Sequence, residues 1–172
     1  MEWISQARDD QQGIKEKFVS IEKVRAYLEP LGVADRIVEF DASSATVELA
    51  AQVLGCEPGM IAKSLAFDVK GEAVLVVVAG DEKIDNHKFK AQFGTKPKML
   101  KVEETELRIG HAVGGVCPFA VKEGVRVFMD KSLNRFEVVY PAAGTSNSCI
   151  WFTPAELERC SAAAGWVDVC KD

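Results

Sequence analysis

The stretch IAKSLAFDVKGEAVLVVVAG, residues 61 to 80, decides the fold. It holds two runs rich in Val, Leu and Phe, and the turn-like triplet Lys70-Gly71-Glu72 separates them. Branched and aromatic residues favour strands, and a short glycine-containing break between two such runs is typical of a β-hairpin. The second run is the longest apolar stretch of the chain and is far too short to cross a bilayer. The sequence therefore predicts a hairpin of buried strands in a soluble domain.

Upstream of the hairpin, apolar residues recur at helical spacing over residues 18 to 31. A short alternating strand is predicted over residues 36 to 40. A second helix is predicted over residues 47 to 54, with Ser43 or Ser44 as its N-cap. Everything that precedes the first helix is polar and of mixed charge, so it is expected to form an N-terminal arm outside the domain.

Downstream, strands and helices alternate without a regular βαβ pattern. A length of 172 residues fits one domain, expected at residues 18 to 172 beside the arm at residues 1 to 17. We expect an α+β fold: a single compact domain whose sheet is mixed and mostly antiparallel, or a partial barrel, flanked by helices. The predicted elements are a helix over residues 86 to 93, strands over 97 to 102, 125 to 130, 136 to 142 and 148 to 152, and a helix that begins after Thr153.

The charge of the chain is unevenly distributed. The whole chain carries −5, but residues 83 to 101 hold six lysines against one aspartate, so this segment alone carries +5. One interpretation is a solvated helix face followed by a lysine-dotted edge strand. The other is a surface that contacts the phosphates of a nucleic acid. The lysines are Lys83, Lys88, Lys90, Lys96, Lys98 and Lys101.

Lys63 lies at the entrance to the first strand of the hairpin. If Leu65 and Phe67 face one side of that strand, Lys63 shares the side, because side chains alternate along a strand. An ammonium group beside an apolar face costs free energy unless it reaches a partner or a cleft. Two interpretations stay open: a surface lysine whose charged head reaches solvent, and a residue of a functional site.

Two glycine-bearing loops complete the polar features of the chain. The segment HAVGGVCPF, residues 111 to 119, can present successive main-chain N–H groups to a carbonyl or a developing oxyanion. The segment PAAGTSN, residues 141 to 147, offers small polar side chains that suit a hydroxyl, amine or phosphate. Each loop can equally be an ordinary structural turn, since turns prefer the same residues.

Other chemistries find little support. Five scattered cysteines without a C-x-x-C pair predict reduced thiols that pack as small hydrophobes, with no metal site and no cofactor. A thiol hydrolase that uses Cys117 with His111 as its base is an open alternative. The sequence contains no G-x-S-x-G nucleophile elbow, P-loop, Rossmann fingerprint or H-E-x-x-H motif. The N-terminus does not read as a signal peptide, so a cytoplasmic protein without membrane contact is expected.

Several strings occur in the order of one known family. SSATVELAAQVLG, IAKSLAF, VLVVVAGD, GHAVGGVCPF and the AAG-containing loop resemble the YbaK/EbsC family, which also occurs as the editing domain of bacterial prolyl-tRNA synthetases and as free-standing proteins. The similarity runs from about Ile37 to Leu157. One position departs from the family pattern, because Ala120 follows Phe119 where relatives usually carry glycine.

The resemblance implies a trans-editing hydrolase that cleaves the ester bond of a mischarged aminoacyl-tRNA, with a small amino acid such as Ala or Cys. Its partner would be tRNA, with an aminoacyl-tRNA synthetase as a second candidate. The alternative is a non-catalytic module that binds an aminoacyl group or tRNA in the same pocket. The resemblance implies Lys63 as the catalytic residue, a pocket formed by Ser64, Gly114, Gly115, Pro118, Phe119, Gly144, Thr145 and Ser146, and tRNA contacts at Lys83, Lys88, Lys90, Lys96 and Lys98.

Overall fold

The structure is a computed structural model that describes residues 20–172 except 42, 43 and 45. The predicted N-terminal arm and the Ser43 cap lie outside the described residues. The helices are one over residues 20–28, α2 (Val47–Leu54), α3 (Asn86–Phe93), α4 (Val102–Ile109) and α5 (Pro154–Cys160). The strands are β1 (Val38–Glu39), β2 (Ile61–Val69), β3 (Glu72–Ala79), β4 (Arg126–Asp130), β5 (Tyr140–Pro141), β6 (Ser148–Cys149) and β7 (Gly165–Val167).

The predicted hairpin is confirmed. Strands β2 and β3 pair antiparallel along their whole length, and the pair Val69–Glu72 closes the ladder. Lys70 and Gly71 form the two-residue loop with φ angles of 53° and 88°. Two successive positive φ angles are the mark of a type I′ turn, whose twist matches that of the strands. The side chain of Asp68 accepts a hydrogen bond of 3.0 Å from the Gly71 N–H and reinforces the turn.

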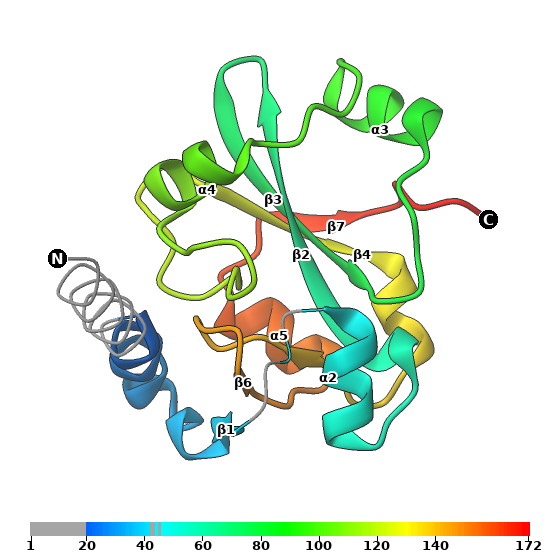
Figure 1. Cartoon of the computed structure of the whole chain (residues 1–172). Helices are drawn as coiled ribbons and strands as arrows, with labels where there is room; N and C mark the ends of the chain where they lie inside the picture. The colour runs from blue at the N-terminus through cyan, green and yellow to red at the C-terminus, as the bar shows by residue number, and fades with distance from the viewer. Residues whose placement is uncertain (1–19, 42–43, 45) are drawn as a thin grey trace, which may run out of the picture.

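The main sheet has five strands in the order β5-β2-β3-β4-β7 (Figure 1). The α+β class and the mixed sheet are confirmed, and within the main sheet the parallel pairs outnumber the antiparallel one. The β2–β3 pair is antiparallel, whereas β2–β5, β3–β4 and β4–β7 are parallel. A parallel neighbour requires a crossover connection. Here α3 and α4 occupy the connection between β3 and β4.

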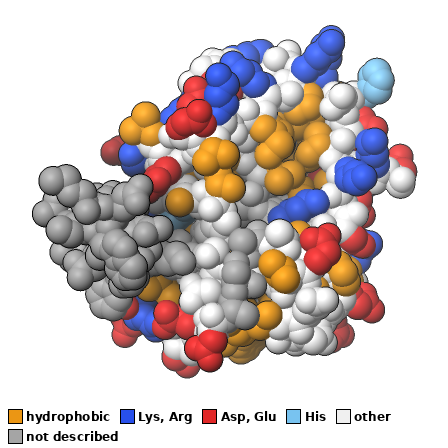
Figure 2. Space-filling view, in the orientation of Figure 1, with side chains coloured by type: hydrophobic (Ala, Val, Ile, Leu, Met, Phe, Trp, Pro, Cys, Tyr) orange, Lys and Arg blue, Asp and Glu red, His pale blue; other side chains and the backbone are white. Residues whose placement is uncertain are grey.

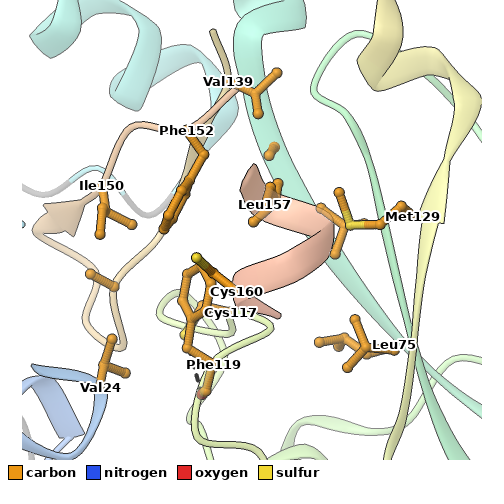
Figure 3. Packing of buried hydrophobic residues seen from close by; sticks show 14 of the residues in the cluster. Val24, Leu75, Cys117, Phe119, Met129, Val139, Ile150, Phe152, Leu157 and Cys160 are labelled. Carbon is orange, nitrogen blue, oxygen red and sulfur yellow. Dashed lines mark hydrogen bonds between the residues drawn. The ribbon is translucent and has the colours of Figure 1, made fainter. Parts of the chain in front are cut away.

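The sheet separates two hydrophobic clusters. Alternate residues of β3 face opposite sides: Val74, Val76 and Val78 belong to one cluster, and Leu75 and Val77 belong to the other. The first cluster is completed by α3 and the C-terminal segment, and the second by α5 and the loops around it (Figure 3). The central strand is buried on both faces, which explains its continuous apolar sequence.

Several predicted elements change in detail. Residues 97 to 102 do not form a strand, because Met99 makes one isolated bridge with Phe67 and Val102 already begins α4. The sequence prediction lacked α4, whose first turn is covered by the Glu104 carboxylate accepting from the Lys101 N–H at 3.3 Å. It also lacked β7, and it made β5 and β6 too long. None of the described helices is long and apolar enough to cross a membrane.

The cap of α2 also differs from the prediction. Thr46, rather than Ser44, accepts a hydrogen bond at the helix start, from the Leu49 N–H at 3.2 Å. Ser44 instead reaches the loop after β5, where its hydroxyl donates to the carbonyl of Ser146 at 3.0 Å. The segment before α2 is therefore attached to the second glycine-bearing loop.

Candidate functional site

A cavity of about 350 Å³ opens along the outer edge of β2. Its wall combines α2 near the start of β2, α4 near its end, the loop at residues 113–116, and β5 with β6 (Figure 1). Most of the lining side chains are apolar, as is usual for small-molecule sites. Met99, Val102 and Val113 line the cavity and are more than half exposed, so they form an apolar rim. Figure 2 shows hydrophobic side chains gathered on this face, with Lys and Arg along its upper margin.

Lys63 lines this cavity from β2. It shares the strand face of Leu65 and Phe67, as the sequence predicts. Its ammonium group donates to the carbonyl oxygens of Gly80, at 3.3 Å, and Glu82. Burial lowers the pKa of Lys63 from its ordinary value, and Cys170 and the nearby carboxylates, Asp81 among them, oppose that shift. The lysine is thus neither free on the surface nor paired in a direct salt bridge with a described carboxylate.

The loop that receives Lys63 is tied down from two sides. The Arg135 guanidinium contacts Asp81 at 2.5 Å and Glu82 at 3.6 Å. The C-terminal segment bonds to the same loop, because the Lys171 N–H donates to Lys83 O at 2.8 Å. The Asp85 N–H donates to the carbonyl of residue 169, also at 2.8 Å. Held at both ends, the loop presents its carbonyls to Lys63 at a defined position.

The carboxylate of Asp130 anchors the C-terminal segment in the interior. Asp130 is fully buried and accepts from the N–H groups of Ser132 and Val169, each at 2.9 Å. The Ser132 hydroxyl in turn accepts from the Ala79 N–H at 3.1 Å, at the end of β3. A buried carboxylate needs such donors to offset the loss of hydration. The network joins β3, β4 and the C-terminal segment behind Lys63.

Of the first glycine-bearing loop, Gly114 reaches the cavity and Gly115 does not. The Gly115 N–H donates to the carbonyl of Ala112 at 3.0 Å, which closes a turn with Gly114 at φ 99°. A Cβ atom on Gly115 would lie 2.5 Å from the carbonyl oxygen of Gly144. The two glycine-bearing loops therefore touch backbone to backbone, and Gly115 permits that contact.

The remaining predicted pocket residues stand behind the wall. Phe119 is fully buried, with its ring centroid 5.4 Å from that of Phe152, and Pro118 is buried as well (Figure 3). The Thr145 hydroxyl is buried and donates to Ser148 at 2.7 Å. Pro118, Phe119, Gly144, Thr145 and Ser146 do not line the cavity. Phe119 is part of the hydrophobic core, where it packs against Phe152. The other four residues belong to the two glycine-bearing loops behind the cavity wall.

Sequence reasoning missed much of the wall. Ser148, Thr105 and Tyr140 line the cavity from β6, α4 and β5, and α2 contributes apolar side chains. Their positions depend on strand pairings between distant segments. No local motif marks them.

His111 and Cys117 meet as the thiol hypothesis requires, but their electrostatics oppose it. Nε2 of His111 donates to the carbonyl of Phe119 at 2.6 Å, so it cannot accept the proton of the Cys117 thiol, which lies 3.6 Å away. Burial raises the pKa of Cys117 to about 12 and lowers that of His111 to about 4. Neither residue lines the cavity. The pair is a neutral element of the core. Four of the five cysteines are buried.

Ala120 has a φ of 52°. The turn after Phe119 thus keeps the left-handed conformation that glycine adopts without strain, although an L-residue occupies it. The departure from the family pattern places a modest conformational strain there.

The lysine-rich segment divides into two parts. Lys88 is held in salt bridges, because its ammonium contacts Asp168 at 3.2 Å and Asp172 at 2.6 Å. These bonds raise the pKa of Lys88. The other predicted contacts are exposed and pair with no described carboxylate: Lys83, Lys90, Lys96 and Lys98. The last two lie on the segment between α3 and α4, beside the apolar rim. Among the described residues, no group of three or more His, Cys, Asp or Glu side chains is placed to hold a metal ion.

Comparison with known proteins shows which family this chain is related to. A family model described as an aminoacyl-tRNA editing domain matches residues 41–160. The YwhH protein of Bacillus subtilis (strain 168), described as uncharacterized, is 45% identical over 90% of this chain and 99% of its own length. The proline–tRNA ligase of Limosilactobacillus fermentum is 33% identical over 66% of this chain, which corresponds to 21% of that enzyme.

A solved structure agrees with these relatives. The crystal structure of a candidate trans-editing enzyme for prolyl tRNA synthetase superposes with a TM-score of 0.81 at 31% identity, over 89% of this chain and 98% of that one. The family model covers most of the present chain, including β2 with Lys63 and the loop with Gly114. The chain therefore belongs to the aminoacyl-tRNA editing domain family.

Proposed function

We propose that this protein hydrolyses the ester bond of a mischarged aminoacyl-tRNA that carries a small amino acid such as Ala or Cys. The observation that carries the proposal is that Lys63 and Gly114 line the same largely apolar cavity, while two main-chain carbonyls hold the Lys63 ammonium in place. A fixed cation and a glycine loop beside an enclosed volume suit an ester whose carbonyl gains negative charge when it is attacked. Family membership supports tRNA as the source of that ester.

Lys63 acts by charge and position. Two of its three ammonium hydrogens bond to the Gly80 and Glu82 carbonyls, and the third is left to hold a phosphate or carbonyl oxygen of the substrate. The lining that the structure describes contains no carboxylate and no imidazole. We therefore assign the nucleophile to water or to a group of the substrate itself, accelerated by proximity. The N–H of Gly114, which has no partner among the described residues, is the donor offered to the oxyanion.

The cavity favours a small acyl group. A volume of about 350 Å³ is at the lower end for a ligand site, and it must hold the acyl group together with part of the terminal ribose. Leu100 and Val116 offer an apolar surface to the amino-acid side chain. Selection by size is worth about 1–3 kcal/mol per methylene group, so neighbouring small amino acids will be cleaved at graded rates.

The exposed lysines would bring the tRNA to this cavity. Lys96 and Lys98 directly precede Met99 of the apolar rim, while Lys90 lies on α3 and Lys83 lies just before that helix. Phosphate contacts of this kind supply salt-dependent affinity without sequence specificity. Lys88 is excluded from this role, because its ion pairs hold it against the C-terminal segment.

Lys63→Met tests the proposal, because it keeps the apolar stem of the side chain and removes the charge. Single-turnover deacylation is measured on alanyl-, cysteinyl-, seryl- and threonyl-tRNA, with thermal unfolding as the control for folding. We expect cleavage of at least one small aminoacyl-tRNA by the parent protein and a loss of 100-fold or more in the variant. Full activity of a folded Lys63→Met protein would remove Lys63 from the mechanism. Binding without any turnover by the parent protein would favour the non-catalytic module.

A further inference from the structure

The outer edge of β2 is paired at both ends and open in the middle. At its start, Ile61 and Ala62 pair with β5. Further on, the Leu100 N–H donates to Ala66 O at 3.0 Å, and the Asp68 N–H donates to the carbonyl of residue 98 at 2.8 Å. Between these two pairings no described segment bonds to the edge, and the cavity lies against the gap.

Ser64 occupies the centre of this gap. Along a strand, the main-chain groups of alternate residues point to the same edge. Ala66 and Asp68 bond outward, away from β3, so the N–H and C=O of Ser64 also point outward, toward the cavity. Neither group has a partner among the described residues. The Ser64 hydroxyl is likewise buried and unpartnered in the described part of the chain.

An unpaired donor and acceptor at a buried strand edge are costly, since each lost hydrogen bond costs about 1–3 kcal/mol. Proteins cover such edges or reserve them for a ligand that completes the ladder. Here the gap holds one outward-pointing residue, because pairing stops at Ala62, resumes at Ala66, and Lys63 and Leu65 bond toward β3. The missing partner is therefore a group with one donor and one acceptor at the spacing of a single amino-acid residue.

We propose that Ser64 binds the α-aminoacyl group of the substrate through its main chain, as one residue of an antiparallel ladder. The Ser64 C=O accepts a hydrogen bond from the α-ammonium group, and the Ser64 N–H donates to the acyl carbonyl oxygen. These are the two bonds that opposite residues exchange in a hydrogen-bonded antiparallel pair. The inference rests on the proposed function and adds a chemical requirement: the site reads a free α-ammonium group next to a carbonyl.

This pairing also sets the direction of the amino-acid side chain. Residues directly opposite each other in an antiparallel pair place their side chains on the same face of the sheet. The acyl side chain would therefore lie on the face of Ser64, where Leu100 and Val116 line the cavity. A D-aminoacyl group would direct its side chain to the other face, toward Lys63 and Leu65. Preference for the L-form follows.

The first test uses a stable analogue, 3′-alanylamino-3′-deoxyadenosine, whose amide resists hydrolysis. Binding is followed by the ¹⁵N–¹H spectrum and by hydrogen exchange of the Ser64 amide. We expect a downfield shift of that amide and exchange slowed at least tenfold. The propionyl and N-acetylalanyl analogues, which lack the ammonium group, should bind at least tenfold more weakly. Equal affinity of all three compounds, or an unmoved Ser64 amide in the saturated protein, would overturn the inference.

Two variants separate main chain from side chain. Ser64→Ala removes only the hydroxyl and keeps both main-chain groups, so the amide of residue 64 should still shift downfield when the alanylamino analogue binds. Ser64→Pro removes the outward N–H and leaves the bonds to β3, which come from Lys63 and Leu65, in place. We expect at least a tenfold loss of affinity, with the hairpin verified from cross-strand contacts in the same spectra. Undiminished affinity of a folded Ser64→Pro protein for the alanylamino analogue would contradict the proposal. If this variant does not fold, the relative affinities of the alanylamino, propionyl and N-acetylalanyl analogues test the proposal instead.

Because these measurements need no turnover, they are independent of hydrolysis. Analogue binding at Ser64 without deacylation of any tRNA would contradict the proposed hydrolase and leave this inference intact. Deacylation by a protein whose Ser64 amide does not shift when the analogue binds would contradict this inference and leave the proposed hydrolase intact.

Discussion

Nε2 of His111 lies 3.6 Å from Sγ of Cys117, and the nitrogen already donates its hydrogen to the carbonyl of Phe119. The pair thus resembles a nucleophile and its base in spacing, while burial holds both groups neutral. Proximity of two reactive side chains does not make a catalytic pair when the shared proton has no acceptor.

The first prediction concerns the thiol. Cys117→Ala should deacylate at the parent rate, because Cys117 is buried away from the cavity, while stability falls by about 1–2 kcal/mol for the small void that it leaves. Alkylation of the native protein followed by peptide mapping gives the control: Cys56, the one cysteine that is not buried, should react well before Cys117. A deacylation rate abolished in a folded Cys117→Ala protein would restore the thiol mechanism.

The second prediction concerns acid stability. The pKa of His111 falls from 6.5 to about 4 on folding, so between these values the unfolded chain binds more protons than the folded one. The contribution is fully present above pH 6.5 and is lost as the pH falls toward 4, up to about 3 kcal/mol. Denaturant unfolding at pH 7 and pH 4.5 measures it. His111→Gln should lose this part of the pH dependence, and His87→Gln, which alters an exposed histidine on α3, should keep it.

The third prediction concerns the contact between the two loops. Gly115→Ala places a Cβ atom 2.5 Å from the Gly144 carbonyl oxygen, and a backbone atom cannot move aside as a flexible side chain can. We expect a loss of about 1–3 kcal/mol and weaker analogue binding, because the loop that carries Gly114 must shift. Gly165→Ala is the matched control, since nothing lies within 4 Å of its added Cβ. If both variants unfold at the same denaturant concentration, the loops do not support each other.

The fourth prediction concerns tRNA. Lys96→Glu combined with Lys98→Glu should weaken tRNA binding and reduce the slope of log K against log salt by about 2, one for each lost phosphate contact. Lys88→Gln should leave that slope unchanged and lower thermal stability, because Lys88 contacts Asp168 and Asp172. Filter binding at four salt concentrations suffices. An unchanged slope in the double variant would make this segment an ordinary solvated surface.

Local signals in the sequence were sufficient for the hairpin, for α3 and for the N-cap of α5. The turn at Lys70-Gly71 and the N-cap at Thr153 depend on neighbours within four residues. By contrast, β7 is short and pairs with β4 across a separation of more than thirty residues, so no local pattern indicates it. The same reason explains α4, whose buried face comes from only Thr105 and Ile109.

The candidate site divides in the same way. Strand parity placed Lys63 on the correct face, and Gly114 reached the cavity as expected. Phe119 did not, because its aromatic ring gains more free energy when it is fully buried in the core than when it is partly exposed at a cavity wall. The open edge at Ser64 depends on where β5 and residues 98–100 stop pairing, which becomes visible only when three distant segments are assembled.

The attachment of the C-terminal segment to residues 83–85 has a consequence for the order of folding. The hairpin can form early, because its contacts are local. Arg135 holds one side of the loop that receives Lys63 through Asp81 and Glu82. The other side is fastened when residues 169–171, more than eighty positions later, reach the loop and Asp130 accepts from Val169. The site would thus be among the last parts of the molecule to mature. Detachment of a few terminal residues would then loosen the lysine while the sheet stays folded.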